Sequence, residues 1–149
     1  NEKKPFLGIC LGMQLIFNKS EEGKLSGLNL IDADIYSFNS VDKKIMGNLK
    51  VPHIGWNNIR FNKDNILLRN IKKDNRFYFA HSYYLKLKQK EISIGETMYG
   101  LNFTSVINLE NIYGVQFHPE KSLDDGKTIF KNFIQLIYAR KKNYSNFTT

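Results

Sequence analysis

The chain has 149 residues, enough for one domain over residues 1–149, and 42% of them are apolar, including 11 Phe and 8 Tyr, so it can bury a substantial core. No apolar run reaches the roughly 18 residues of a membrane span, and the first residues do not resemble a signal peptide, which predicts a cytoplasmic protein with no membrane partner. The net charge of +8 raises the possibility of nucleic-acid binding. Its lysines are scattered and accompany no nucleic-acid motif, which argues against such a partner.

The first predicted element is an apolar strand over residues 5–9, which ends at the single cysteine. The chain lacks an initial Met and enters this strand almost at once, so we expect a C-terminal fragment of a longer chain. One cysteine excludes an internal disulfide and fits a reducing compartment. A short helix is expected over residues 11–18, a loop over 19–29 and an alternating strand over 30–38.

The second half of the chain predicts mainly strands. Short apolar segments separated by polar turns occupy residues 57–61, 76–87 and 92–107, and another apolar strand in 111–122 breaks at Pro119. The last predicted element is a helix over residues 124–142, which begins with acidic residues and carries apolar residues at helical spacing: Ile129, Phe130, Phe133, Ile134 and Ile137. The pattern predicts an α/β domain with a mixed sheet.

The most informative segment surrounds Cys10, which lies between Gly8 and Gly12 where the predicted strand becomes a helix. This arrangement is the thiol form of a nucleophile elbow, whose crowded backbone favours glycine on both sides. The helix that begins at Leu11 would direct its N–H groups at the sulfur, lower the thiol pKa and hold an oxyanion. The alternative is a buried structural cysteine.

A nucleophilic cysteine needs a base, and His118 is the strongest candidate. It follows an apolar strand, and Glu120 lies two residues further on, where a carboxylate can orient the imidazole. Taken alone, the "HPE" segment could be an ordinary turn. No two His or Cys residues have the spacing that zinc sites favour, so we expect no metal.

Together these segments are similar to a known family. "GICLGMQ" and "HPEKS" resemble the class I glutamine amidotransferases, and "SEEG", "VPHIGWNNI" and "FYFAHSYY" narrow the resemblance to the glutaminase branch of imidazole glycerol phosphate synthases, in histidine biosynthesis. The resemblance extends from Pro5 to the final helix and implies the family's mixed sheet flanked by helices. The family's N-terminal βα part, with its glycine-rich oxyanion loop, is missing here, so we expect the isolated fragment to be inactive.

The resemblance also implies residue roles. Cys10 would be the nucleophile, His118 the general base and acid, and Glu120 the residue that orients His118. Glutamine would be bound by Leu11, Gln14, Glu22, Ser82 and Tyr83, with Glu22 at the α-ammonium group and the backbone of Ser82 and Tyr83 at the α-carboxylate. Without the resemblance, Gln14 would be an exposed polar residue and Glu22 a solvated loop charge.

The family's partner is a (β/α)₈-barrel cyclase, which receives the ammonia in a heterodimer, and no cofactor is implied. A partner-facing surface near the active site would contain exposed aromatic, histidine and lysine side chains: His53, Trp56, Asn57, Tyr78, His81 and Lys121. The alternative is a core tryptophan with two buried, hydrogen-bonded histidines.

Two other functions stay open. The same glutaminase could serve another acceptor, such as a surface-sugar pathway, or the chain could be an inactive homologue that only binds a partner. The presence of Cys10, His118 and Glu120 together argues against inactivity.

Overall fold

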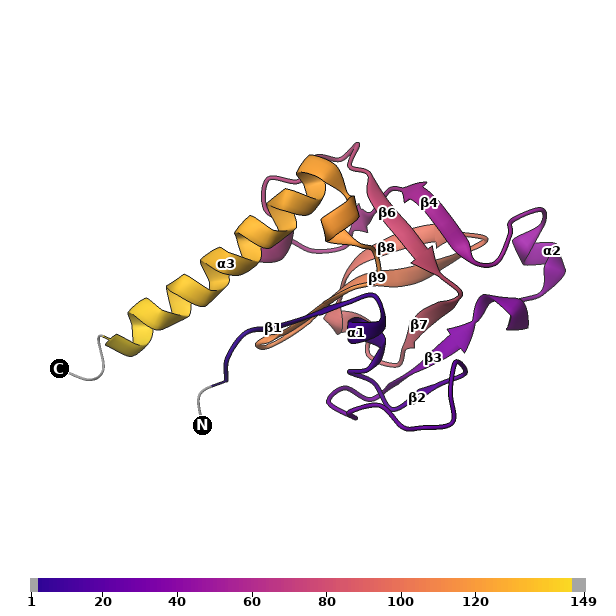
Figure 1. Cartoon of the computed structure of the whole chain (residues 1–149), viewed down its shortest axis with the longest axis horizontal. Helices are drawn as coiled ribbons and strands as arrows, with labels where there is room; N and C mark the ends of the chain where they lie inside the picture. The colour runs from indigo at the N-terminus through magenta and orange to yellow at the C-terminus, as the bar shows by residue number, and fades with distance from the viewer. Residues whose placement is uncertain (1–2, 146–149) are drawn as a thin grey trace.

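The computed structural model describes residues 3–145 of the chain, and its centre is a curled mixed sheet (Figure 1). The strand order is β1-β10-β9-β7-β3-β2, and β8 pairs with both β9 and β5. Within this sheet β1 pairs with β10, and β2 with β3, in parallel; the other pairs are antiparallel. The strands are β1 Phe6–Ile9, β2 Lys19–Ser20, β3 Ala33–Ser37, β5 Arg60–Phe61, β7 Tyr83–Leu87, β8 Ser93–Tyr99, β9 Leu101–Leu109 and β10 Ile112–Val115. The predicted mixed α/β fold is confirmed.

A second sheet has two antiparallel strands, β4 (His53–Asn57) and β6 (Phe77–His81), in which His53 lies opposite His81. Only Ser82 separates β6 from β7, so the chain passes there from the small sheet to the large one (Figure 1). The apolar segment 76–87, which predicted one strand, therefore forms two. We call β4 and β6 together the β4–β6 ribbon.

Within residues 3–145 the helices are α1 (Leu11–Gln14), α2 (Lys43–Met46) and α3 (Leu123–Ser145), and four short 3₁₀ turns accompany them: η1 Phe38–Ser40, η2 Ile66–Leu68, η3 Lys90–Ile92 and η4 Pro119–Lys121. The expected C-terminal helix is confirmed, and Figure 1 shows α3 running from the sheet toward the C-terminus. Its first half is held by Asn132, whose amide donates to the carbonyls of Leu67 (2.9 Å) and Arg69 (2.7 Å) in and after η2. No helix among residues 3–145 is both long and apolar enough to cross a membrane.

Helix α1 is shorter than the expected helix over residues 11–18. After Gln14 the backbone bonds tighten to three-residue spacing, Ile16 to Met13 and Phe17 to Gln14, and Asn18 then bonds to Ala33 of the neighbouring strand. Ile16 and Phe17 are fully buried in this turn. Their burial favours a bend toward the core over further helix.

The main core is rich in aromatic rings. Phe38, Phe77, Phe79, Phe103 and Phe117 are each at most 2% exposed and lie in one cluster. Burying each ring stabilises the fold by roughly 1.5–3 kcal/mol. A smaller cluster includes Met13 and packs α1 against the large sheet. These two clusters hold the end of β1 and the end of β10 in place.

Candidate active site

Cys10 occupies a sharp turn between β1 and α1. Its φ of 50° lies in the left-handed region, which is uncommon for a residue other than glycine. A Cβ on Gly8 would lie 2.6 Å from the Gly12 carbonyl oxygen and 2.7 Å from the Met13 nitrogen, so only glycine fits there. At Gly12 a Cβ would meet nothing within 4 Å. The expectation that crowding requires both glycines is therefore right for Gly8 and wrong for Gly12, because Gly12 faces open space.

The Cys10 sulfur is partly buried and lies near two polar groups. It is 3.9 Å from the Ala80 carbonyl oxygen, to which a thiol can donate, and the Gln116 amide donates to it from 3.7 Å. Burial raises the pKa of the Cys10 thiol, and the Leu11 N–H lowers it by less. The expected net lowering of this pKa by the helix end is therefore wrong, because desolvation outweighs the helix N–H groups.

His118 follows β10, the strand paired in parallel with β1. Ile9 lies opposite Val115, and the Cys10 N–H donates to the Val115 carbonyl at 2.8 Å. Cys10 and His118 therefore both lie just beyond the carboxyl ends of neighbouring strands. The His118 N–H donates to the Tyr78 carbonyl at 2.8 Å. Among the hydrogen bonds of residues 3–145 there is none between the Cys10 sulfur and the His118 ring.

The His118 ring is oriented by Glu120. Its Nδ1 lies 2.7 Å from Oε1 of the carboxylate, and η4 brings the two side chains to the same side of the chain. Pairing at Nδ1 leaves Nε2 as the ring nitrogen available to a second group. This is the arrangement that a histidine base with a carboxylate partner requires.

A cleft of about 290 Å³ opens beside the cysteine. The predicted substrate residues all line it together with Cys10: Leu11, Gln14, Glu22, Ser82 and Tyr83. Its other lining residues are Pro52, Ile54, Ala80 and His81, whereas His118 and Glu120 are not among them. Larger surface hollows of about 520 to 590 Å³ lie elsewhere, but none of them is lined by Cys10 or His118.

Gln14, which lines the cleft, belongs to a buried amide network whose other member, Gln116, was not predicted from the sequence. Gln14 is 6% exposed, and its amide donates to the side-chain oxygen of Gln116 at 3.0 Å. Gln116 is fully buried and donates in turn to the Cys10 sulfur. The available signal was a glutamine within the apolar run "YGVQF", since a polar side chain in a buried strand needs partners.

The expected partner surface divides into two groups. His53 and His81 are 3% and 6% exposed and hydrogen-bond each other at 2.9 Å, so their expected exposure was wrong; the alternative of two buried, hydrogen-bonded histidines applies. Trp56 is 42% exposed and its ring meets that of Tyr78, over which the Lys121 ammonium lies at 5.7 Å. Asn57 is half-buried and donates to the Met98 carbonyl.

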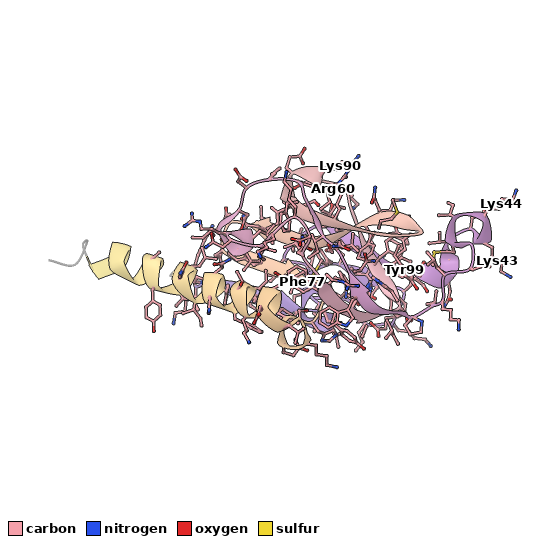
Figure 2. The ribbon with its side chains drawn as sticks, turned by 90° about the horizontal axis from the view of Figure 1, so that it is seen from above. Lys43, Lys44, Arg60, Phe77, Lys90 and Tyr99 are labelled. Atoms are coloured by element: carbon pink, nitrogen blue, oxygen red, sulfur yellow. The ribbon has the colours of Figure 1, made fainter. Side chains whose placement is uncertain are left out.

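The remaining charges do not gather at this site. Figure 2 shows Lys43 and Lys44 on α2 at one end of the molecule, while Arg60 and Lys90 lie along another edge. In the described part of the chain, no three His, Cys, Asp or Glu side chains are grouped so that they could hold a metal ion.

Comparison with known proteins identifies the family. The sequence profile of the family described as glutamine amidotransferase class-I matches residues 1–136. The chain belongs to the class I glutamine amidotransferases. Among solved structures, this amidotransferase chain is similar to a putative GMP synthase subunit from Thermoplasma acidophilum, with a TM-score of 0.71, 18% identity, and coverage of 97% of this chain and 62% of that one. At that identity the likeness concerns the fold alone.

Several curated relatives of this amidotransferase chain carry the name imidazole glycerol phosphate synthase subunit HisH. The protein of Leptospira borgpetersenii is 46% identical over 91% of this chain and 66% of its own length. Those of Moorella thermoacetica and Methanocaldococcus jannaschii are 45% and 42% identical, over 89% and 92% of this chain and 60% and 66% of their own lengths. The chain thus spans 60 to 66% of the length of these relatives.

Proposed function

We propose that the full-length protein is the glutaminase subunit of an imidazole glycerol phosphate synthase, which hydrolyses glutamine and passes the ammonia on for histidine biosynthesis. The observation that carries this proposal is the cleft in which Cys10 meets the five predicted substrate residues, with the His118–Glu120 pair following the strand next to that of Cys10. The name shared by the curated relatives supports the choice of branch.

In this mechanism Cys10 is the nucleophile. His118 takes the proton of the Cys10 thiol, and the resulting thiolate attacks the side-chain amide carbon of glutamine, while main-chain N–H groups such as that of Leu11 hold the oxyanion. His118 protonates the departing ammonia, which leaves a thioester on the sulfur. His118 then deprotonates a water molecule that attacks the thioester, releasing glutamate and restoring the thiol. Glu120 stabilises the imidazolium that forms between these steps.

The cleft has the groups that an α-amino acid needs. Glu22 is an exposed carboxylate on the cleft wall that would receive the α-ammonium group. The main chain at Ser82 and Tyr83 would meet the α-carboxylate, and Gln14 would also contact the substrate. No cofactor enters this scheme.

The partner in this proposal is a (β/α)₈-barrel cyclase, with which the protein forms a heterodimer in the cytoplasm. The outer side of the β4–β6 ribbon and the start of α3 offer exposed apolar side chains: on the ribbon Ile54 is 61% and Trp56 42% exposed, and Leu123 at the start of α3 is 71% exposed. An exposed tryptophan bordered by Tyr78 and Lys121 has the composition of an interface anchor with a polar rim. The lyase step of such a synthase would belong to the other subunit.

The test is ammonia transfer in the assembled complex. With a histidine-pathway cyclase and its nucleotide substrate, we expect glutamine-dependent product formation, and Cys10→Ala should reduce it by at least about 10⁴-fold, as loss of a covalent nucleophile does. Lys90→Ala, at an exposed position on η3 away from the cleft, is the control.

Two outcomes would overturn the proposal. Glutamine hydrolysis that serves no histidine cyclase but does serve a surface-sugar enzyme would favour the other pathway. Full glutaminase activity in the Cys10→Ala complex would remove the cysteine mechanism and revive the partner-binding homologue.

A further inference from the structure

The proposed mechanism uses neither of the two buried histidines behind the cleft. His53 and His81 are opposite each other in the β4–β6 ribbon, and Nδ1 of His53 lies 2.9 Å from Nε2 of His81. The ring of His53 is stacked between Phe79 and Tyr99, at centroid distances of 4.7 and 3.9 Å. When two buried imidazoles hydrogen-bond each other, one ring nitrogen must donate a proton and the other must accept it, so the tautomer of each ring is fixed.

The hydrogen bonds fix where each proton lies. Nδ1 of His81 is 2.7 Å from the Tyr83 carbonyl oxygen; a carbonyl only accepts, so this nitrogen carries the proton. In a neutral ring Nε2 is then bare and accepts from Nδ1–H of His53. Nε2 of His53 is bare in its turn, and the Asn57 amide donates to it from 3.3 Å. Both histidines therefore carry their proton on Nδ1.

The environment keeps both rings neutral. Burial, followed by the neighbouring His81, lowers the pKa of His53 to about 3. Burial also lowers the pKa of His81 to about 4; the bond to Tyr83 opposes this shift and His118 adds to it. At physiological pH neither ring holds a second proton, so each hydrogen bond from Asn57 through His53 and His81 to the Tyr83 carbonyl keeps the same donor and acceptor.

This chain of bonds ends at the wall of the cleft. Ser82 joins the small sheet to the large one, and His81 spans this crossover by donating to the carbonyl of Tyr83. The Gln14 amide is a second donor to the same oxygen, at 3.5 Å. The Ser82 carbonyl accepts from the Phe38 N–H at 2.9 Å. Two side-chain donors, His81 and Gln14, and one main-chain donor, Phe38, therefore hold the crossover.

We propose that His53 and His81 are positioning residues: with both protons on Nδ1, the pair fixes the crossover at Ser82 through the Tyr83 carbonyl and so sets the main chain that receives the carboxylate of the substrate. The part that concerns substrate rests on the proposed function. His53 acts through His81, and Asn57 completes the chain from the far side of the ribbon.

Nitrogen-15 NMR of the histidine rings tests the proton positions without any substrate. We expect two of the three histidines to show protonated Nδ1 and bare Nε2, unchanged from about pH 8 to about pH 5. His118, paired with Glu120 and partly exposed, serves as the comparison within the same sample. A proton on Nε2 of either buried ring, or titration of either one near pH 6.5, would overturn the proposal.

Two variants of His81 in the full-length complex test the positioning role. The Asn side chain of His81→Asn keeps a donor near the place of Nδ1, whereas His81→Leu fills the space without one. Both lose the bond to His53. We expect His81→Leu to raise the KM for glutamine by about fivefold to tenfold with kcat within about twofold, and His81→Asn to recover at least about half of that increase.

The KM values and the NMR result distinguish failure of the positioning proposal from failure of the proposed function. Equal KM values for the two variants, or an unchanged KM in His81→Leu, would mean that the pair has only a structural role. A complex without glutaminase activity would refute the proposed function while the NMR result still decides the proton positions. If His81→Leu does not fold, the NMR result of the unaltered protein and the KM of His81→Asn against the unaltered complex decide the proposal.

Discussion

The backbone of Cys10 carries strain that its neighbours maintain. A non-glycine residue at positive φ costs of order 1–3 kcal/mol and persists only where the surrounding structure enforces it. Here Cys10 is fixed on one side by its bond to Val115 and on the other by α1, whose backbone lies directly against Gly8. The strain is thus located at the residue that has to be presented to a substrate.

The pair Gly8 and Gly12 provides a direct test of this turn. Gly8→Ala places a methyl group 2.6 Å from the Gly12 carbonyl oxygen, and we expect it to reduce the free energy of unfolding by about 2 kcal/mol or more. Gly12→Ala is the matched control: it enters open space in α1 and should be neutral or stabilising by up to about 1 kcal/mol. Denaturant unfolding of both variants measures the difference, and equal destabilisation would contradict the steric explanation.

Single functional residues could be predicted from the sequence where they lie in a short, recognisable motif. Cys10, Gly8, His118 and Glu120 were identifiable because two glycines and a His-x-Glu spacing are short-range signals. Gln116 was not, since its function depends on a sulfur 106 positions away in the chain. The thiol pKa was mispredicted for a related reason: burial comes from the whole fold, whereas the helix end is visible in the sequence.

Among the elements, the β4–β6 ribbon should make stability depend on pH. Both buried histidines have a folded pKa, about 3 and about 4, below the usual 6.5. As the pH falls below about 6.5 these histidines bind protons in the unfolded chain but not in the folded one, so stability falls until about pH 4 for His81 and about pH 3 for His53. The slope is at most about 1.4 kcal/mol per pH unit for each histidine.

The check is urea unfolding at a series of pH values, compared between the unaltered protein and the double variant His53→Asn/His81→Asn. The variant should be less stable near pH 7 but should lose much less stability between about pH 6.5 and about pH 5. The same slope in both proteins would show that other groups cause the acid sensitivity.

The sequence predicted the existence of elements better than their ends. The helical spacing of apolar residues predicted α3 close to its observed position, because this helix is long and periodic. The single segment expected over 92–107 forms two strands, β8 and β9, which turn at Gly100. The sequence could not show the break at Ser82, since the apolar pattern of 76–87 continues through it. The break depends on the partners of the flanking strands, β4 for one and β3 for the other.

Over the whole molecule, exposed aromatic side chains distinguish one surface. Trp56 is 42% exposed on the outer side of the β4–β6 ribbon, whereas Tyr138 lies far along α3 with 65% of its surface exposed. With the proposed cyclase partner, we expect Trp56→Ala to weaken association by about 2 kcal/mol, or roughly thirtyfold, and Tyr138→Ala to leave it within about twofold. Titration calorimetry with the purified partner measures both; an unchanged affinity for Trp56→Ala would place the interface elsewhere.

The overall architecture was predictable because the family resemblance covers most of the chain. The composition alone predicted a core, and the buried aromatic cluster confirms it. The charged residues labelled in Figure 2 lie at separate places, Lys43 and Lys44 on α2 and Arg60 and Lys90 along another edge. The assignment of His53 and His81 to the surface failed because the sequence does not show which side of β4 faces inward. Ile54 and Trp56 took the outer side, and this left His53 on the inner one.

Strand β6 fixes the distance between Cys10 and His118, the two residues on which the proposed chemistry depends. Alternate carbonyls of β6, those of Tyr78 and Ala80, contact the His118 N–H and the Cys10 sulfur, so the separation is tied to the repeat of an extended chain, roughly 7 Å for two residues. The extended backbone of β6 therefore keeps the distance between these two contacts constant. Insertions and deletions accumulated over evolution should fall in the exposed turns at residues 23–26 and 72–74, whereas a single residue gained or lost between Tyr78 and Ala80 would change the distance between the two groups.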